Sequence, residues 1–192
     1  MQDTNYLRKT PLVVTGIILT ALKKHFMLED DLRYSEDNVD TKITIEPSFR
    51  WTPEACQNRP GVYVKRNAVS IGNPRAGMDD LYSYDNLLSE RTYAFFMDIP
   101  FTIYCISKNP GITETIAYTC FEALTVLGPV IKKDFEFNKF IVNQIGAISQ
   151  IEENKELYLI PLNLDILLNE TWTLRQDAQK ITGIHLDSNF SI

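Results

Sequence analysis

The order of helical and strand-like patterns constrains the fold of this chain more than any single motif does. Apolar residues recur at helical spacing near residues 11–27 and again near residues 112–127. Between and after these segments, apolar and polar residues alternate with the period of two that is typical of strands with one buried face. This order predicts an α+β fold: a mixed, largely antiparallel sheet with two amphipathic helices packed on one face and a long protruding β-hairpin loop.

Each predicted helix begins at a dipeptide that suits a helix N-terminus. Thr10-Pro11 and Asn109-Pro110 place a capping side chain before a proline, whose missing N–H would be unpaired in the first turn anyway. Gly16 indicates a place where another backbone comes close, and Gly128-Pro129 predicts the end of the second helix. The residues expected in the core are Ile17, Leu22, Ile103, Ile116, Cys120, Leu124 and Leu162.

Strand patterns make up most of the remaining sequence. The last two long strands are separated by a short polar turn at residues 152–155, so we expect a hairpin with one core-facing side. The segment at 52–60, between two prolines, is expected to be a loop. The predicted strands are a short edge strand up to Pro47, then residues 61–71, 91–107 with a bend at Pro100, 140–151, 156–168 and, in the tail, 184–186.

Length and charge give the domain organisation. A chain of 192 residues predicts a single domain, 1–192, with an acidic loop at 28–40 and an extended loop at 72–90. The acidic loop holds six acids and one arginine, a net charge of −5 in a chain whose total is −6. It indicates either a solvated loop or a negative rim that repels nucleic acid or meets a basic partner. The nearly neutral remainder argues against a dedicated DNA-binding protein, which usually has a basic face.

Cysteine usage and apolar runs bear on the compartment. The chain has three cysteines, an odd number without C-x-x-C spacing, which favours a reducing compartment. Cys105 and Cys120 fall at apolar positions and are expected to be small core residues. Asp3 precedes any apolar run, so the N-terminus does not resemble a signal peptide. The longest apolar run, 12–22, is too short to span a bilayer, and no membrane partner is expected.

Residues 72–90 break the strand alternation. Glycine and proline residues in this segment disfavour regular secondary structure. A loop of this length between two strands is usually functional or disordered. It contains arginine, methionine and tyrosine, which are typical of interface cores. A contact surface and a plain hairpin tip both fit this composition. The candidate interface residues are Arg75, Met78, Asp79, Asp80, Leu81, Tyr82, Tyr84 and Arg91.

No motif in the sequence indicates a reaction. Neither of the glycine-rich nucleotide-binding patterns, G-x-x-x-x-G-K-[ST] and G-x-G-x-x-G, occurs. The only histidines are His25 and His185, too few for a histidine-rich metal site, and no nucleophile elbow accompanies His185. The acidic clusters lack the spacing of a calcium-binding loop. We therefore assign no catalytic, cofactor-binding or metal-binding residue and expect a protein that is not an enzyme and has no cofactor.

Four segments together carry a resemblance to a known family. They are PLVVTGIILTALKKHF, RPGVYVKRNAVSIG, FTIYCISKNPGITETIAYTCFEAL and LYLIPLNLDILLNETW, in that order. In pattern and element order the chain resembles the tailed-bacteriophage tail terminator proteins and their relatives among head–tail joining (neck) proteins. It departs from the compact form of that family in its segments 28–40 and 72–90.

The resemblance implies a structural virion protein without enzymatic activity. Such proteins form rings, often hexameric, that end the tail tube or connect it to the neck. The implied partners are further copies of the chain, tail tube or neck/connector proteins, and genomic DNA that passes through the lumen without sequence-specific binding. The implied location is the virion, after synthesis in the cytoplasm of the host bacterium.

The charge and the strand pattern of the chain are compatible with a ring subunit but do not require one. DNA slides more easily past a neutral or acidic surface, because such a surface does not grip phosphates. A ring subunit also needs two different complementary surfaces, which free strand edges and a long loop would supply. The alternatives are a monomeric adaptor or assembly chaperone that binds a partner through residues 72–90 and, less favoured, a small-molecule enzyme. No convergent acid–base group in the sequence supports the enzyme.

Overall fold

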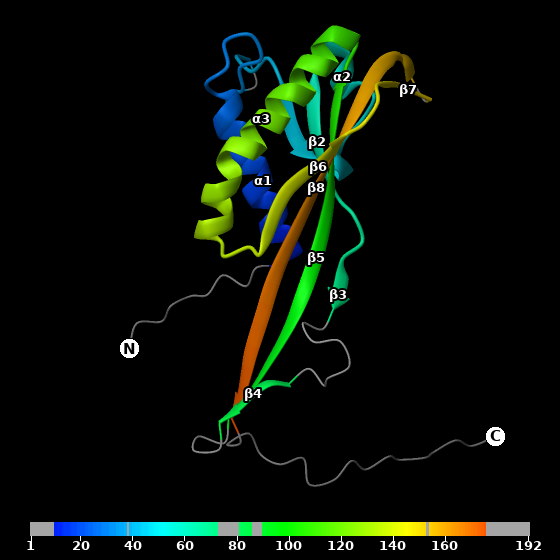
Figure 1. The fold of residues 1–192 in the computed structure, drawn as a ribbon. Coiled ribbons are helices and arrows are strands. Elements are labelled where there is room, and N and C mark those ends of the chain that lie inside the picture. The colour runs from blue at the N-terminus through cyan, green and yellow to red at the C-terminus, as the bar shows by residue number, and fades with distance from the viewer. Residues whose placement is uncertain (1–9, 38, 73–80, 86–89, 153, 176–192) are drawn as a thin grey trace, which may run out of the picture. The chain divides into compact units, whose positions relative to one another are not determined.

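The chain divides into two compact units. A computed structural model describes residues 10–37, 39–72, 81–85, 90–152 and 154–175 (Figure 1). By its internal contacts the chain forms a main unit, Met1–Ile71 with Met97–Leu168, and a second unit, Gly72–Phe96 with Asn169–Ile192. The division rests on contacts alone, and the expectation of one domain over 1–192 stays a prediction.

The described residues form an α+β fold with a mixed, largely antiparallel sheet, as the sequence predicts. Its strand order is β1-β2-β5-β8-β6, with β3 and β4 paired to β5 and β7 paired to β8. β1 runs parallel to β2, whereas β2, β4, β6 and β7 pair antiparallel with their neighbours β5 and β8. The strands are β1 (Thr44–Pro47), β2 (Gly61–Arg66), β3 (Ser70–Gly72), β4 (Leu81–Asp85), β5 (Glu90–Ser107), β6 (Lys139–Ile145), β7 (Ser149–Ile151) and β8 (Asn154–Arg175). The helices are α1 (Pro11–Phe26), α2 (Ala55–Asn58) and α3 (Pro110–Asp134), with a 3₁₀ turn, η1 (Ser48–Arg50).

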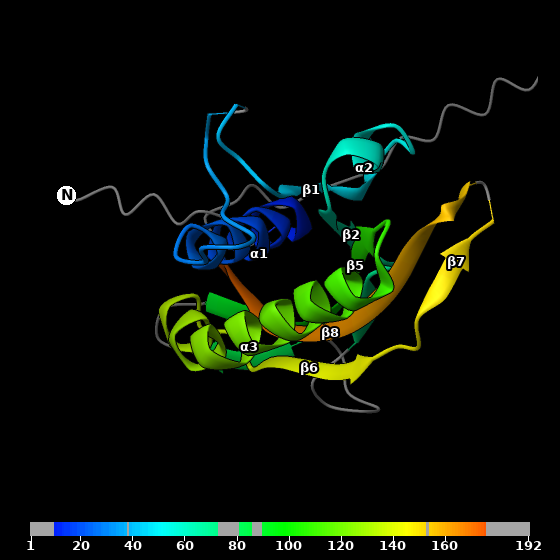
Figure 2. The same ribbon diagram turned by 90° about the horizontal axis from the view of Figure 1, so that it is seen from above.

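One core lies between the two long helices and the sheet. Figure 2 shows α1 and α3 on the same side of the sheet, and buried side chains of both helices join those of five strands in a single cluster. On β8 every second residue from Ile160 to Leu168 is buried, which confirms the core-facing side of the closing hairpin. Six of the seven predicted core residues are at most 1% exposed. The exception is Ile17, which is only partly buried at the margin of the core.

Both helix starts are confirmed. The Asn109 side-chain oxygen accepts hydrogen bonds from the backbone N–H groups of Gly111 at 2.8 Å and Ile112 at 3.4 Å. The Thr10 hydroxyl accepts from the N–H of Val13 at 3.4 Å. The expectation for Gly16 is wrong within the described residues, because a Cβ built there would meet no atom within 4 Å.

The predicted end of the second helix at Gly128-Pro129 is wrong. α3 continues to Asp134 with Pro129 inside it, although an internal proline removes a hydrogen bond and costs about 3 kcal/mol. Gly128 is buried, and a Cβ there would lie 3.3 Å from the ring of Phe140. Ile131, one turn further, is only 7% exposed, and burial of such a side chain contributes about 1.5–3 kcal/mol. Contacts between α3 and the sheet therefore offset the free-energy cost of Pro129.

α3 ends instead in a Schellman motif. Glu136 has a φ of 53°, the left-handed conformation usual for the residue after the C-cap. The N–H of Phe137 donates to the Lys132 carbonyl at 2.9 Å, and that of Glu136 donates to the Lys133 carbonyl. Phe137 is buried and stacks on Phe140 with ring centroids 6.4 Å apart. Because a glutamate rather than a glycine takes the left-handed position, the sequence shows no stop signal there.

Two predicted strands are each divided. Residues 61–71 form β2 and β3, and the N–H of Asn67 between them donates to the Pro100 carbonyl at 2.9 Å. Residues 140–151 form β6 and β7 because Gly146 meets Pro161 of β8, which has no N–H to donate to the ladder. The Gly146 N–H donates to the Pro161 carbonyl at 2.7 Å. The predicted loop at 52–60 contains the single helical turn α2.

Candidate interaction surfaces

The structure brings four of the eight predicted interface residues onto one pair of strands in the second unit. Leu81, Tyr82 and Tyr84 belong to β4, and Arg91 belongs to β5. In the antiparallel register Tyr84 lies opposite Arg91. The prediction of a loop over the whole of 72–90 is therefore wrong for 81–85, where five residues give too little alternation to indicate a strand. The other four candidates, Arg75, Met78, Asp79 and Asp80, lie outside the described residues.

β5 and β8 each contribute residues to both compact units. In the main unit Ile99 of β5 and Leu168 of β8 are fully buried, and the two strands extend to Glu90 and Arg175. The sequence predicts β5 from residue 91 onward but ends the last strand at 168, so the final part of β8 was not predicted. We use the term strand extension for residues 81–85, 90–96 and 169–175. Every described helix lies in the main unit, so no described helix belongs to the unit that contains the strand extension. The predicted strand at 184–186 lies outside the described residues.

A row of polar side chains crosses the sheet in the main unit. The Asn67 amide donates to the Thr102 hydroxyl at 3.0 Å, and that hydroxyl donates to the Asn163 carbonyl oxygen at 3.3 Å. The Asn163 amide then donates to Gln144 of β6 at 3.4 Å. Asn163 alternates with buried residues of β8, so it lies on the face opposite α1 and α3. Each of these uncharged side chains therefore has a hydrogen-bond partner within the row.

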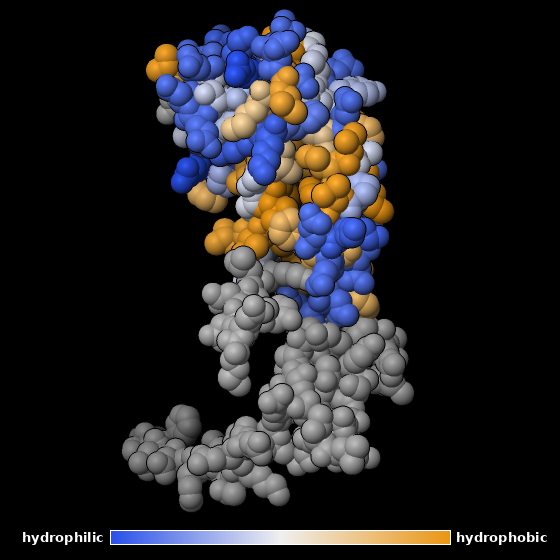
Figure 3. Space-filling view, turned by 90° about the vertical axis from the view of Figure 1, so that its left-hand side faces the viewer, coloured by the Kyte–Doolittle hydropathy of each residue, from blue (hydrophilic) through white to orange (hydrophobic). Residues whose placement is uncertain are grey.

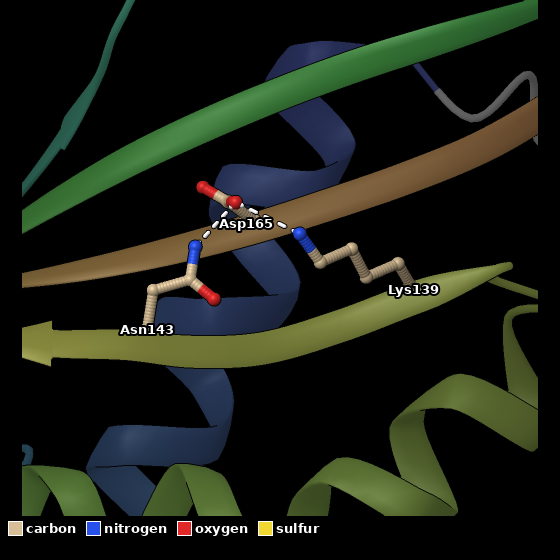
Figure 4. A network of polar contacts seen from close by, with 3 residues as sticks. All are labelled: Lys139, Asn143 and Asp165. Atoms are coloured by element: carbon tan, nitrogen blue, oxygen red, sulfur yellow. Dashed lines mark hydrogen bonds and ion pairs between the residues drawn. The ribbon is translucent and has the colours of Figure 1, made fainter.

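One charged group on β6 is neutralised beside this row. The Lys139 ammonium lies 2.9 Å from a carboxylate oxygen of Asp165 on β8, and the Asn143 amide donates to the same oxygen (Figure 4). All three residues are partly or fully exposed, so the ion pair contributes only about 0–1 kcal/mol to stability. The pair neutralises Lys139, whereas Lys65 of β2, which lies opposite Thr102 in the strand register, is exposed.

Exposed apolar side chains lie on the helical side of the main unit. Leu12 of α1 is 74% exposed, and Val126 and Val130 of α3 are 64% and 55% exposed. Figure 3, which faces the side where α1 and α3 lie, shows apolar residues gathered in the lower part of the described surface. Apolar surface of this kind marks a contact site when it is contiguous and large.

The acidic segment 28–40 is attached to the end of α1. The N–H of Tyr34 donates to the Phe26 carbonyl at 2.9 Å, and the Lys23 ammonium lies 5.1 Å from the centre of the Tyr34 ring. The Lys42 ammonium donates to the backbone carbonyl of Asp30 at 2.8 Å. Five of the six acidic residues are exposed, which agrees with a solvated loop. Contact with a basic partner stays a prediction.

A second, smaller apolar cluster contains Cys56. Its buried members are Cys56, Tyr63, Ile106 and Leu157. Burial raises the pKa of the Cys56 thiol, which donates a hydrogen bond to the Tyr63 hydroxyl at 3.5 Å. Burial also raises the pKa of Tyr63. A thiol with a raised pKa stays protonated near neutral pH and is a poor nucleophile.

Cys105 and Cys120 are core residues, as the sequence predicts. Their side chains are completely buried and their sulfur atoms lie 3.9 Å apart, without a disulfide. Burial, together with the neighbouring Cys120 thiol, raises the pKa of Cys105 well above its usual value. These thiols pack β5 against α3 and present no reactive group.

Neither a metal centre nor a relative identifies the protein. Within the described ranges, no three His, Cys, Asp or Glu residues are grouped so that they would hold a metal ion. None of the helices in the described part is long and apolar enough to cross a membrane. No protein-family model and no curated protein matches the chain. What the described residues define is an α+β protein with two outer strands, a strand extension and an exposed apolar helical side.

Proposed function

We propose that this protein is a structural virion protein of a tailed bacteriophage. It forms a ring of identical subunits, six in number, at the head–tail connection or the tail end, and DNA passes through the lumen. The observation that carries the proposal is the element order. α1, a short strand pair, the long β5, α3 after an Asn-Pro start and a closing hairpin follow one another in the order on which the family resemblance rests.

The two outer strands of the sheet support assembly into a ring. β1 and β6 stand at opposite ends of the main strand order, and among the described residues neither has a second neighbour. β1 has four residues and ends in Pro47, whereas β6 has seven and contains an irregularity after Val142. Edges that differ in this way suit a head-to-tail contact between copies, which joins two unlike surfaces and closes into a ring.

The strand extension is the proposed contact arm. Small isolated groups of strands are marginally stable in water unless something covers one face. In this proposal a neighbouring subunit or a tail protein covers one face of these strands. Leu81, Tyr82, Tyr84 and Arg91 lie in this extension and remain the proposed interface residues, together with Arg75, Met78, Asp79 and Asp80.

The charge distribution supports a lumen through which DNA moves. The net charge is −6, and the polar row on the sheet consists of amide and hydroxyl groups. Affinity for DNA depends mainly on cations that neutralise phosphates, and on this face Lys139 is paired with Asp165 although Lys65 is exposed. A subunit of this kind would let DNA pass without holding it.

Electron microscopy of the full-length chain and of particles that contain it tests the ring. We expect a closed ring of identical subunits, with six copies of the chain in each particle. A monomer in dilute solution is compatible with the proposal, because ring subunits can require a template. A native particle with a single copy of the chain would show that the proposal is wrong.

A shortened variant tests the contact arm separately. Replacing residues 73–89 by Gly-Asn shortens this segment to two residues and removes β4. We expect unchanged thermal unfolding of the main unit and no assembly. The control is Glu54→Gln with Lys108→Gln, which alters two exposed charged side chains outside both candidate segments and should still assemble. Normal particles from the shortened variant would leave the ring proposal intact and exclude the arm.

A monomeric adaptor or assembly chaperone is the second candidate. The observation that favours it is that the four described candidates, Leu81, Tyr82, Tyr84 and Arg91, lie on one pair of strands, as expected for a protein with one binding site. A stable complex with one copy of the chain and one partner molecule, lost in the shortened variant and without any ring, would support this function over the first.

A further inference from the structure

We draw no further inference here: the strongest candidate, the exposed apolar side chains Leu12, Val126 and Val130 on the helical side of the main unit, carries nothing because no feature of the structure shows what covers them.

Discussion

The substitution Gly146→Ala tests the reason for the break between β6 and β7. A Cβ at position 146 would lie 2.6 Å from Cγ and 3.0 Å from Cδ of Pro161, and 3.1 Å from its carbonyl oxygen. The proline ring is rigid and belongs to the middle of β8, so the backbone of one strand has to move. Overpacking of this kind costs about 1–3 kcal/mol. The displacement also weakens the hydrogen bond from the Gly146 N–H to the Pro161 carbonyl, which is 2.7 Å long.

Gly16→Ala is the matched control. A Cβ at Gly16 would meet no atom within 4 Å, and the residue is exposed inside α1. Alanine favours a helix interior over glycine by about 0.5–1 kcal/mol, so this substitution should stabilise the protein. The same chemical change thus has opposite expected signs at the two positions.

Thermal unfolding followed by circular dichroism measures both effects. For a chain of this size, 1 kcal/mol shifts the Tm by about 2–4 °C, so Gly146→Ala should lower the Tm by roughly 2–12 °C. Gly16→Ala should raise it by about 1–4 °C. A Gly146→Ala protein as stable as the parent would refute the steric account of the break. Loss of stability in Gly16→Ala would show that a segment outside the described residues contacts this helix face.

Three further predictions concern the core, a helix cap and the thiols. Leu124→Ala, at a site only 1% exposed, should lower the free energy of unfolding by about 2–5 kcal/mol, and an unchanged midpoint in urea would contradict the assigned core. Asn109→Ala should cost about 1 kcal/mol, with most of it restored by Asn109→Asp; equal losses for both would mean that the side-chain oxygen is not the cap. Burial raises the pKa values of Cys56 and Cys105 above their ordinary value of 9.0, so folding favours the protonated thiols. Their contribution to stability should be complete below about pH 8.5 and decline as the pH rises further, because the unfolded chain then ionises first. The Tm measured from pH 7 to 10 should show this decline, and Cys56→Ala with Cys105→Ala should reduce it; an identical pH profile in that double variant would assign the decline to other groups.

The local structure of the candidate segment was predicted only in part. Sequence reasoning selected residues 72–90 because they lack alternation, and it treated the whole segment as a loop. Within the described part, residues 81–85 pair with the start of β5, so the candidate residues there lie on a strand. The five residues alone do not predict a strand, because the formation of β4 depends on its pairing with β5. The continuation of β8 to Arg175 was missed because the strict apolar alternation ends near Leu168.

The features that were predicted correctly from the sequence are those that a few neighbouring residues encode. Asn109-Pro110 starts α3 because the cap and the first-turn proline act within a single turn, and the alternation from Ile160 to Leu168 decides which side of β8 is buried. The end of α3 and the interruption of the hairpin could not be predicted in this way. Those outcomes depend on Gly128 against Phe140 and on Gly146 against Pro161, contacts between residues that are distant in the chain. Local preferences for helix or strand amount to about 1 kcal/mol for most residues, and burial of one large apolar side chain outweighs them.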